Sequence, residues 1–423
     1  MAGAELLASV EALARVGADP RGGLSRLGLT ASERAARELV SGLARRYGLQ
    51  AGTDAAANLI LRRREPVTGR PILLIGSHLD TVEQGGSLDG AYGVLAGVQV
   101  LRVLDQLTLR LPYEPVVIGF ANEEGGYLNC PFWGSKAFTG QLADPGELIA
   151  RDGTPIDSVL RAAGGDLSRL GQARVAPGSV GGYLELHIEQ GPVLHEAGIP
   201  IGVVSAITGR TVLSVVVEGS QNHAGTTPME HRRDALAAAA RVVLAVEAMA
   251  RDERRCAVAT VGTLDVDPQS TNVVAGRVRL GVELRDSAPR RLAEAERSLA
   301  GRLDQIAASC RVQISQAPVM RCAPALGDPR LIEQISSAAD RLGLESMLLA
   351  SGAGHDAQVM AAETPIGMIF VPSIGGISHA PGESTAAADL VRGADVLLQA
   401  ALAICDQPAP PTDVTGAAPA PTS

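Results

Sequence analysis

Aromatic residues are scarce in this chain of 423 residues, which contains five Tyr, four Phe and one Trp. So few rings argue against a stacking surface for single-stranded nucleic acid, and a formal net charge of −9 argues against any polyanionic partner. Lysine is rarer still, because Lys136 is the sole lysine among 37 basic residues. Lysine-centred chemistry is therefore disfavoured, whereas 46% hydrophobic residues predict a large aliphatic core in two or three domains.

Cysteine and long apolar runs are also in short supply. The five cysteines are scattered and form no C-x-x-C pair, which indicates free thiols in a reducing compartment. No uninterrupted apolar run reaches the roughly 18 residues that a membrane span needs. The first 20 residues include Glu5 and Glu11 and lack a basic start followed by an apolar block, so they predict a helix rather than a signal peptide. We expect a cytoplasmic protein with no membrane contact.

Short apolar runs alternate with helical patterns in the first half of the chain. The runs are typical of strands buried on both faces, and the alternation predicts an α/β fold with a mostly parallel sheet covered by helices. Thr30 and Glu33 have the spacing of a capping box at the start of one helix. Strands are predicted at residues 71–75, 115–120, 183–188 and 201–207, and helices at 30–47 and 93–104.

The middle of the chain changes character. Its β-branched and alternating runs predict the order β-α-β-β-α-β, which is a ferredoxin-like α+β unit, with a last strand at 312–315. We expect a split first domain at 1–207 and 321–406, with the second domain inserted at 208–320. Residues 407–423 are rich in Pro, Ala and Thr and predict a disordered tail.

Polar residues gather where the predicted buried strands end, which is where open α/β sheets bind ligands. A histidine or a carboxylate stands there beside glycines in four separate segments. One such segment alone is usually a solvated loop or a hydrogen-bonded structural residue, whereas four together indicate a metal site. The residues are His78, Asp80, Asp89, Glu123, Glu124, His187 and His379.

The number of metal ions stays open on spacing alone. Two histidines with two carboxylates suit one zinc ion, whereas three histidines with two carboxylates suit two metals that share a carboxylate. The adjacent Glu123 and Glu124 can divide the work, one as ligand and the other as proton acceptor, if glycines 125 and 126 bend the turn. Asp80, two residues after His78, can hydrogen-bond its imidazole and set the tautomer.

Long motifs make the chain similar to a known family. It resembles the M20 metallopeptidase superfamily, and within it the hydantoinase/carbamoylase branch of N-carbamoyl-L-amino-acid hydrolases, β-ureidopropionases and allantoate amidohydrolases. The resemblance runs in order from about residue 5 to 405. It rests on GSHLDTV, DGA-x-GVLAG, NEEGG, ELHIEQGPVL, NHAGTTPM, SGAGHDAQ and SIGGISHAPGE.

The resemblance implies two divalent metals, zinc or manganese, cobalt or nickel, in a binuclear-metal exopeptidase-like domain. Asp89 would bridge them, with His78 and His187 on one metal. Glu124 and His379 would bind the other. The histidine at 187, where peptidase branches have an acidic ligand, marks the carbamoylase branch.

The resemblance also implies how the reaction is run. Glu123 would be the general base, and Asp80 is a further predicted catalytic residue through its bond to His78. His223 would stabilise the oxyanion from the inserted domain, which in the family is a lid that also forms the homodimer. Arg285 would bind the substrate carboxylate as a bidentate partner. The remaining substrate contacts implied are Gln190, Asn272, Gly354 and His355.

The expected activity is hydrolysis of the C–N bond of an N-carbamoyl amino acid to amino acid, CO₂ and NH₃. The alternatives are allantoate or N-carbamoyl-β-alanine hydrolysis, then an M20 peptidase or aminoacylase, which His187 disfavours. An inactive homologue that acts in binding or assembly comes last, because all five ligands and Glu123 are present. Residues 126–133 depart from the family pattern, which leaves the side-chain preference of the pocket open.

Overall fold

A computed structural model describes residues 3–107 and 111–406 of the chain, so the predicted tail at 407–423 lies outside the described residues. These residues divide into two compact units. Residues 206–325 form one unit, and the described residues on either side of them form the other. In the described part of the chain, no helix combines the length and apolarity that crossing a membrane requires.

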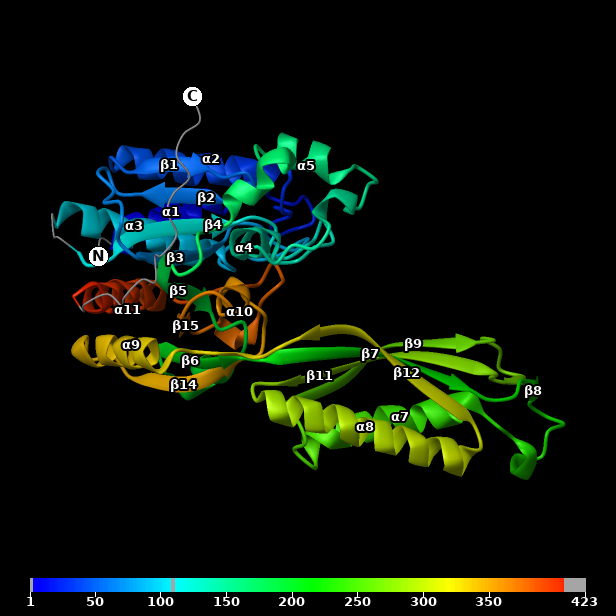
Figure 1. Cartoon of the computed structure of the whole chain (residues 1–423). Coiled ribbons are helices and arrows are strands. Elements are labelled where there is room, and N and C mark those ends of the chain that lie inside the picture. The colour runs from blue at the N-terminus through cyan, green and yellow to red at the C-terminus, as the bar shows by residue number, and fades with distance from the viewer. Residues whose placement is uncertain (1–2, 108–110, 407–423) are drawn as a thin grey trace. The chain divides into compact units, whose positions relative to one another are not determined.

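The first unit is built on a nine-stranded mixed sheet in the order β1-β2-β4-β3-β5-β15-β6-β13, with β14 paired to β6 (Figure 1). The central strands β4, β3, β5 and β15 are parallel, and β2 and β6 join them antiparallel. The prediction of an α/β fold with a mostly parallel sheet is thus confirmed for the centre of the sheet. The strands are β1 (Gln50–Thr53), β2 (Leu59–Arg62), β3 (Ile72–His78), β4 (Glu114–Phe120), β5 (Val180–Ile188), β6 (Ile201–Ile207), β13 (Ala325–Leu326), β14 (Ser346–Ser351) and β15 (Ile366–Val371).

Helices cover this sheet, and α3 is buried along most of its length because its sequence is apolar on every side. Gly93 lets α3 approach the sheet, since a Cβ there would lie 2.1 Å from the carbonyl oxygen of Leu186. Together, α1, α3 and α11 contribute to one aliphatic core with the central strands. The helices are α1 (Gly3–Leu13), α2 (Ala31–Arg46), α3 (Ala91–Gln106), α4 (Trp133–Thr139), α5 (Ile156–Ala162), α6 (Val193–Ala197), α9 (Pro329–Arg341), α10 (Asp356–Met360) and α11 (Ala387–Cys405).

Helix α2 begins at the predicted place, but the hydrogen bonds of the predicted capping box are not formed. Thr30 occupies the N-cap position but its side chain caps no N–H group of the helix. Its hydroxyl donates instead to the carbonyl of Leu27, and the buried Glu33 carboxylate accepts the N–H of Leu29 at 2.6 Å. The helix is found where it was expected, but Glu33 binds the loop before it rather than the N-cap residue.

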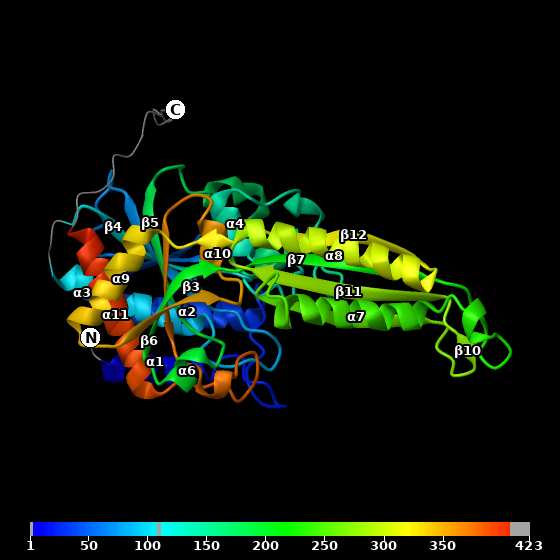
Figure 2. The ribbon, with the colours of Figure 1, turned by 90° about the horizontal axis from the view of Figure 1, so that it is seen from below.

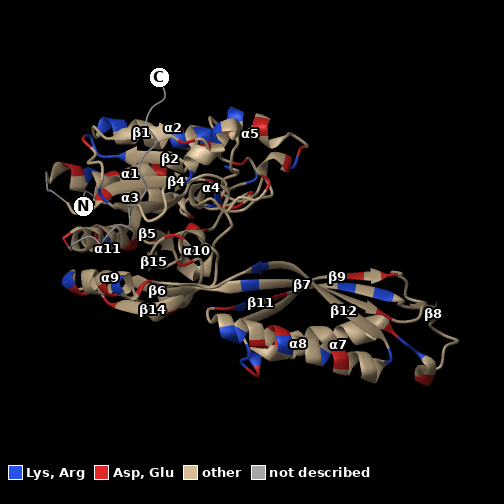
Figure 3. Cartoon of the chain, viewed as in Figure 1, with Lys and Arg blue, Asp and Glu red and all other residues tan. Residues whose placement is uncertain are grey.

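The second unit contains a four-stranded antiparallel sheet in the order β12-β7-β11-β9, with α7 and α8 along one face (Figure 2). Alternate residues of β7 and β11 are buried against these helices, as expected of a sheet with one covered face. Acidic and basic residues are interspersed along α8 (Figure 3). The elements are β7 (Gly209–Glu218), β8 (Asn222–His223), α7 (Ala235–Arg251), β9 (Val258–Asp267), β10 (Val273–Val274), β11 (Arg277–Asp286), α8 (Pro289–Cys310) and β12 (Gln313–Cys322).

The last strand of this unit is longer than predicted. It was expected at 312–315, but β12 continues to Cys322. Pro318 lies inside it, and the pairing register with β7 shifts between Pro318 and Met320. Because β12 is an edge strand, a proline and an irregularity can be accommodated without breaking an internal ladder.

Candidate metal centre and active site

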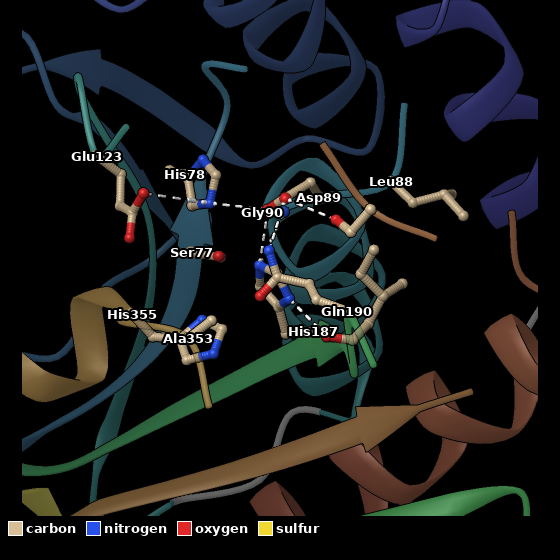
Figure 4. Close-up of polar contacts among 12 residues, drawn as sticks. Ser77, His78, Leu88, Asp89, Gly90, Glu123, His187, Gln190, Ala353 and His355 are labelled. Atoms are coloured by element: carbon tan, nitrogen blue, oxygen red, sulfur yellow. Dashed lines mark hydrogen bonds and ion pairs between the residues drawn. The ribbon is translucent and has the colours of Figure 1, made fainter. Parts of the chain in front are cut away.

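Predicted site residues of the first unit lie together at the carboxyl ends of the central parallel strands. Figure 4 shows His78, Asp89, Glu123, His187, Gln190 and His355 among them. His78 is the last residue of β3, Glu123 follows β4, and His187 lies near the end of β5. Asp89 lies just before α3. Since parallel neighbours end at the same edge of a sheet, residues distant in sequence meet there.

Two groups of potential ligands share one carboxylate. In the first, the Nε2 atoms of His78 and His187 lie 3.4 and 3.1 Å from Oδ1 of Asp89. In the second, Nε2 of His379 lies 3.1 Å from Oδ2 of Asp89 and 3.3 Å from Oε1 of Glu124. Within each group the ligand atoms lie within 4.8 Å of one another, so each group could hold a metal ion. Each oxygen of Asp89 therefore faces a different group.

The two inner imidazoles are oriented by backbone carbonyls. Nδ1 of His78 lies 3.1 Å from the carbonyl oxygen of Asp80, and Nδ1 of His187 lies 2.8 Å from that of Ile188. A carbonyl accepts the proton on Nδ1, which leaves Nε2, on the side of Asp89, as the nitrogen that could bind a metal. The N–H of Gly90 also points at Nε2 of His187, at 3.0 Å.

The Asp80 carboxylate contacts the imidazole of His78, as its spacing predicted, with Oδ1 3.5 Å from Nδ1. Its two oxygens also accept the N–H groups of Glu123 and Glu124, at 3.0 and 3.1 Å, which the spacing did not predict. Asp80 therefore holds the turn that carries both glutamates.

That turn bends at Gly125, as predicted, and also at Asn122, which was not predicted. Asn122, with a φ of 53°, and Gly125, with a φ of 70°, adopt the left-handed conformation, whereas Gly126 does not. The Asn122 side chain donates to the carbonyls of Leu128 and Cys130. An asparagine tolerates the left-handed region better than most residues, so its amide can fasten the loop while its backbone turns.

Mutual electrostatics make this cluster suited to a cation. Burial alone would raise the pKa of Asp89, but hydrogen bonds from His187, His379 and His78 hold it well below its usual range. The bonds to Asp89 and Glu124 raise the pKa of His379 to about 10. The carboxylates thus stabilise positive charge on the imidazoles, and a divalent ion would take the place of those protons. The donor set of three imidazoles and two carboxylates fits such an ion.

Glu123 lies beside the ligand groups. Its carboxylate is buried, with Oε2 3.9 Å from Nε2 of His78. Burial raises its pKa well above the usual range, and Glu124 and Asp356 add to the effect while His78 opposes it. A carboxylate whose pKa is raised in this way can both take and return a proton near neutral pH.

The predicted substrate residues of the first unit border the same cluster. Nε2 of Gln190 donates to Asp89 at 2.8 Å, while its Oε1 is buried and has no hydrogen-bond partner. His355 is buried with its ring centroid 4.6 Å from that of His187, and burial lowers its pKa well below the usual range. A Cβ at Gly354 would lie 3.0 Å from Cζ of Phe132, so the departing loop 126–133 contacts this position.

Three predicted site residues, His223, Asn272 and Arg285, lie in the second unit. His223 in β8 pairs with Val273 in β10, and the N–H of Ala224 donates to the carbonyl of Asn272, so His223 and Asn272 are neighbours. Nδ1 of His223 accepts the N–H groups of Gly225 and Thr226, at 2.9 and 3.2 Å. Neutral His223 must therefore carry its proton on Nε2.

Arg285 lies in β11 of the second unit, apart from the β8–β10 ribbon. Its Nε contacts Oε1 of Glu283 at 2.6 Å, and Oε2 of Glu283 contacts Nε of Arg210 at 2.6 Å. One carboxylate thus lies between two guanidinium groups.

Two further residues of the site had no role in the sequence-based prediction. Gly90 has a φ of 62°, and a Cβ there would lie 2.4 Å from the ring of His78. Glu383 is buried and accepts the N–H groups of Leu88 and Asp89. Sequence position could have indicated both residues, because Gly90 directly follows Asp89 and Glu383 lies four residues after His379.

Comparisons with known proteins show the family to which this fold belongs. The chain belongs to the peptidase family M20/M25/M40, whose profile matches residues 74–403. It is 40% identical over 387 residues to the N-carbamoyl-L-amino acid amidohydrolase of Geobacillus stearothermophilus, covering 91% of this chain and 94% of that protein. It is 32% identical over 396 residues to the allantoate amidohydrolase of Bacillus subtilis, covering 92% and 94%.

A solved structure shows the same family relationship. The amidase of the hydantoinase/carbamoylase family from Burkholderia multivorans has a TM-score of 0.86 and 33% sequence identity, over 96% of this chain and 98% of that one. Resemblance to this branch, predicted from the motifs, is thereby confirmed.

Proposed function

We propose that the protein is a metal-dependent amidohydrolase that cleaves the C–N bond of N-carbamoyl amino acids to amino acid, CO₂ and NH₃. The observation that carries the proposal is the sharing of Asp89 between two ligand groups, with the buried Glu123 beside them. The amidohydrolases to which the chain is similar provide independent support.

Two divalent ions, one at each group, complete the proposed site. Such ions supply Lewis acidity, which polarises a carbonyl and lowers the pKa of water. The inner group offers His78 and His187, the outer group offers Glu124 and His379, and Asp89 belongs to both.

The chain's own residues then move the proton and orient the substrate. Glu123 takes a proton from the attacking water and returns it to the leaving nitrogen as the C–N bond breaks, which releases the amine and a carbamate that decomposes to CO₂ and NH₃. His223 donates its Nε2 proton to the oxyanion, as the bonds to its Nδ1 support. The unpaired Oε1 of Gln190 can accept a ureido N–H.

Further substrate contacts are proposed for the second unit and for the loop before α10. Arg285 binds the substrate carboxylate, and Asn272 pairs with the ureido group. Gly354 and His355 border the substrate on the side of His187, where their position beside Phe132 and His187 supports the role.

The second unit is proposed as a lid that also joins two protomers into a homodimer. Exposed apolar side chains on it, Leu244 on α7 and Val258 and Leu264 on the edge strand β9, support an interface. Light scattering during gel filtration should report twice the mass of 43.5 kDa. A monomeric mass at concentrations where the enzyme is active would contradict this assembly.

A substrate screen tests the activity. The protein, loaded with Zn or Mn in turn, is offered N-carbamoyl-α-amino acids, N-carbamoyl-β-alanine, allantoate and dipeptides, and ammonia or free amine is measured. We expect the highest kcat/KM on an N-carbamoyl-α-amino acid. Allantoate is the second candidate because of the similarity to the B. subtilis enzyme, and a preference for dipeptides would reject the proposal.

The Glu123→Gln variant separates chemistry from binding. Because Glu123 belongs to neither ligand group, the variant should bind the same amount of metal as the wild type. Turnover should fall by about 10³-fold or more, since the amide cannot accept the proton. Retained turnover would remove Glu123 from the role of base.

A further inference from the structure

The Glu383 carboxylate is buried between two loops that carry proposed metal ligands. Its side chain belongs to the loop after β15, four residues beyond His379. Oε1 accepts the N–H groups of Leu88 and Asp89, at 2.9 and 3.1 Å. Oε2 accepts the hydroxyl of Ser378 at 2.8 Å. The carboxylate thus connects the backbone of Asp89 to the residue directly before His379.

The neighbouring loop is shaped around this carboxylate. A Cβ at Gly86 would lie 2.0 Å from Oε1 of Glu383 and 2.4 Å from its Cβ, so only glycine leaves room there. The Ser378 hydroxyl also lies 3.3 Å from Oδ2 of Asp89. A buried carboxylate needs hydrogen-bond donors to be stable. The donors to Glu383 are the N–H groups of Leu88 and Asp89 and the hydroxyl of Ser378, which precedes His379.

We propose that Glu383 is a positioning residue for Asp89, and through it for both metal ions, an inference that rests on the proposed function. The bonds to the N–H groups of Leu88 and Asp89 set the backbone from which the Asp89 side chain projects. That direction decides whether Oδ1 faces His78 and His187 while Oδ2 faces His379. A second link through Ser378 keeps the outer ligand loop at the same place.

A positioning role has a consequence that a purely structural contact lacks. If the loop of Asp89 is not held, metal binding must order it, and the entropy of ordering is subtracted from the affinity. Removing groups that orient metal ligands typically weakens metal binding by about 10- to 100-fold. We expect a loss of that size for Glu383→Ala.

The experiment measures metal affinity of the full-length protein by competition with a chromophoric zinc chelator, at a temperature well below the unfolding transition of each variant. Glu383→Ala removes all three bonds. Glu383→Asp keeps the charge but withdraws the carboxylate from the N–H groups, and it decides the question if the alanine variant does not fold. Glu383→Gln keeps an oxygen for both N–H groups, and its amide can donate to the Ser378 hydroxyl.

Glu114→Ala is the matched control. Glu114 is also buried, and its carboxylate accepts hydrogen bonds from the Arg63 guanidinium and the N–H of Val67. It is the first residue of β4, whereas the site follows the other end of that strand. It should lower thermal stability without changing zinc affinity.

The expected result is a 10- to 100-fold weaker zinc affinity for the alanine and aspartate variants, with the glutamine variant and the control within about threefold of the wild type. Wild-type affinity in the alanine or aspartate variant would overturn the positioning role, and so would a glutamine variant as weak as alanine. If the wild type itself bound no zinc, the proposed function would fail instead, so the two failures are distinguishable.

Discussion

The Asp80→Asn substitution tests how the turn after β4 is held. The wild-type carboxylate is fully buried and accepts two N–H groups, those of Glu123 and Glu124. An asparagine side chain of the same shape has one oxygen, so it can accept only one of them. Its NH₂ group then faces the second N–H, donor against donor.

The size of the effect follows from these bonds. A hydrogen bond to a charged group contributes about 1.5–3 kcal/mol, and a buried N–H left unpaired costs about 1–3 kcal/mol. The substitution should therefore disfavour the present turn by about 2.5–6 kcal/mol in total. Since 1.4 kcal/mol is about a factor of ten, a loss of about 3 kcal/mol, near the lower end of this range, would reduce the population of the competent turn about 100-fold.

Turnover and metal content should both respond, because the turn carries Glu123 and Glu124. We expect kcat to fall by about 100-fold or more and the outer metal to bind more weakly. Stopped assays at saturating metal and substrate give kcat, and equilibrium dialysis gives the metal content. A variant with kcat and metal content within threefold of the wild type would refute the argument that Asp80 acts through the turn.

Three other perturbations probe separate parts of the site. Gly90→Ala places a Cβ 2.4 Å from the ring of His78 and strains a backbone with φ at 62°. The metal affinity of the inner group, measured by chelator competition, should therefore fall about 100-fold or more, and an unchanged affinity would contradict the close packing. Because the pKa of His379 is raised to about 10, metal must displace its proton at neutral pH. Affinity of the outer group should therefore rise about tenfold per pH unit between pH 6 and 8, and a flat profile would exclude this competition. Arg285→Ala should lower kcat/KM about 100-fold on carboxylated substrates but not on uncharged ureido analogues, and equal losses on both would argue against a carboxylate clamp.

The central strands could be predicted because burial on both faces leaves a clear trace in the sequence. The run 71–75 overlaps β3, which begins one residue later at Ile72, and the run 115–120 lies within β4; both strands are almost wholly buried. The strand β14 (Ser346–Ser351) was not predicted, because half-buried positions at the side of a sheet show neither a continuous nor a regular alternating pattern. The second half of β12 was likewise not predicted, because Pro318 is atypical of a strand interior.

The ligand candidates could be predicted because they follow apolar strands, but their bonding could not. Spacing correctly placed Asp80 next to the imidazole of His78, but its bonds to N–H groups 43 and 44 residues away could not be predicted. Similarly, Glu383 meets the Asp89 backbone across 294 residues. Such contacts depend on how loops from different strands meet at the sheet edge, which no local pattern encodes.

The two ligand groups that share Asp89 differ in ways that affect metal exchange. The inner group has two imidazole nitrogens and one carboxylate, and the His78 side chain is 2% exposed; the outer group has one imidazole and two carboxylates, and the His379 side chain is 47% exposed. Imidazole suits zinc, and carboxylates suit harder ions such as manganese. If each group holds one ion, as proposed, a chelator should strip the outer ion first, and a harder ion could then be added in its place. The metal content of a preparation would thus depend on the chelators and metals used during purification. Proteins with a different ion at each position could be made by adding the two metals in a chosen order.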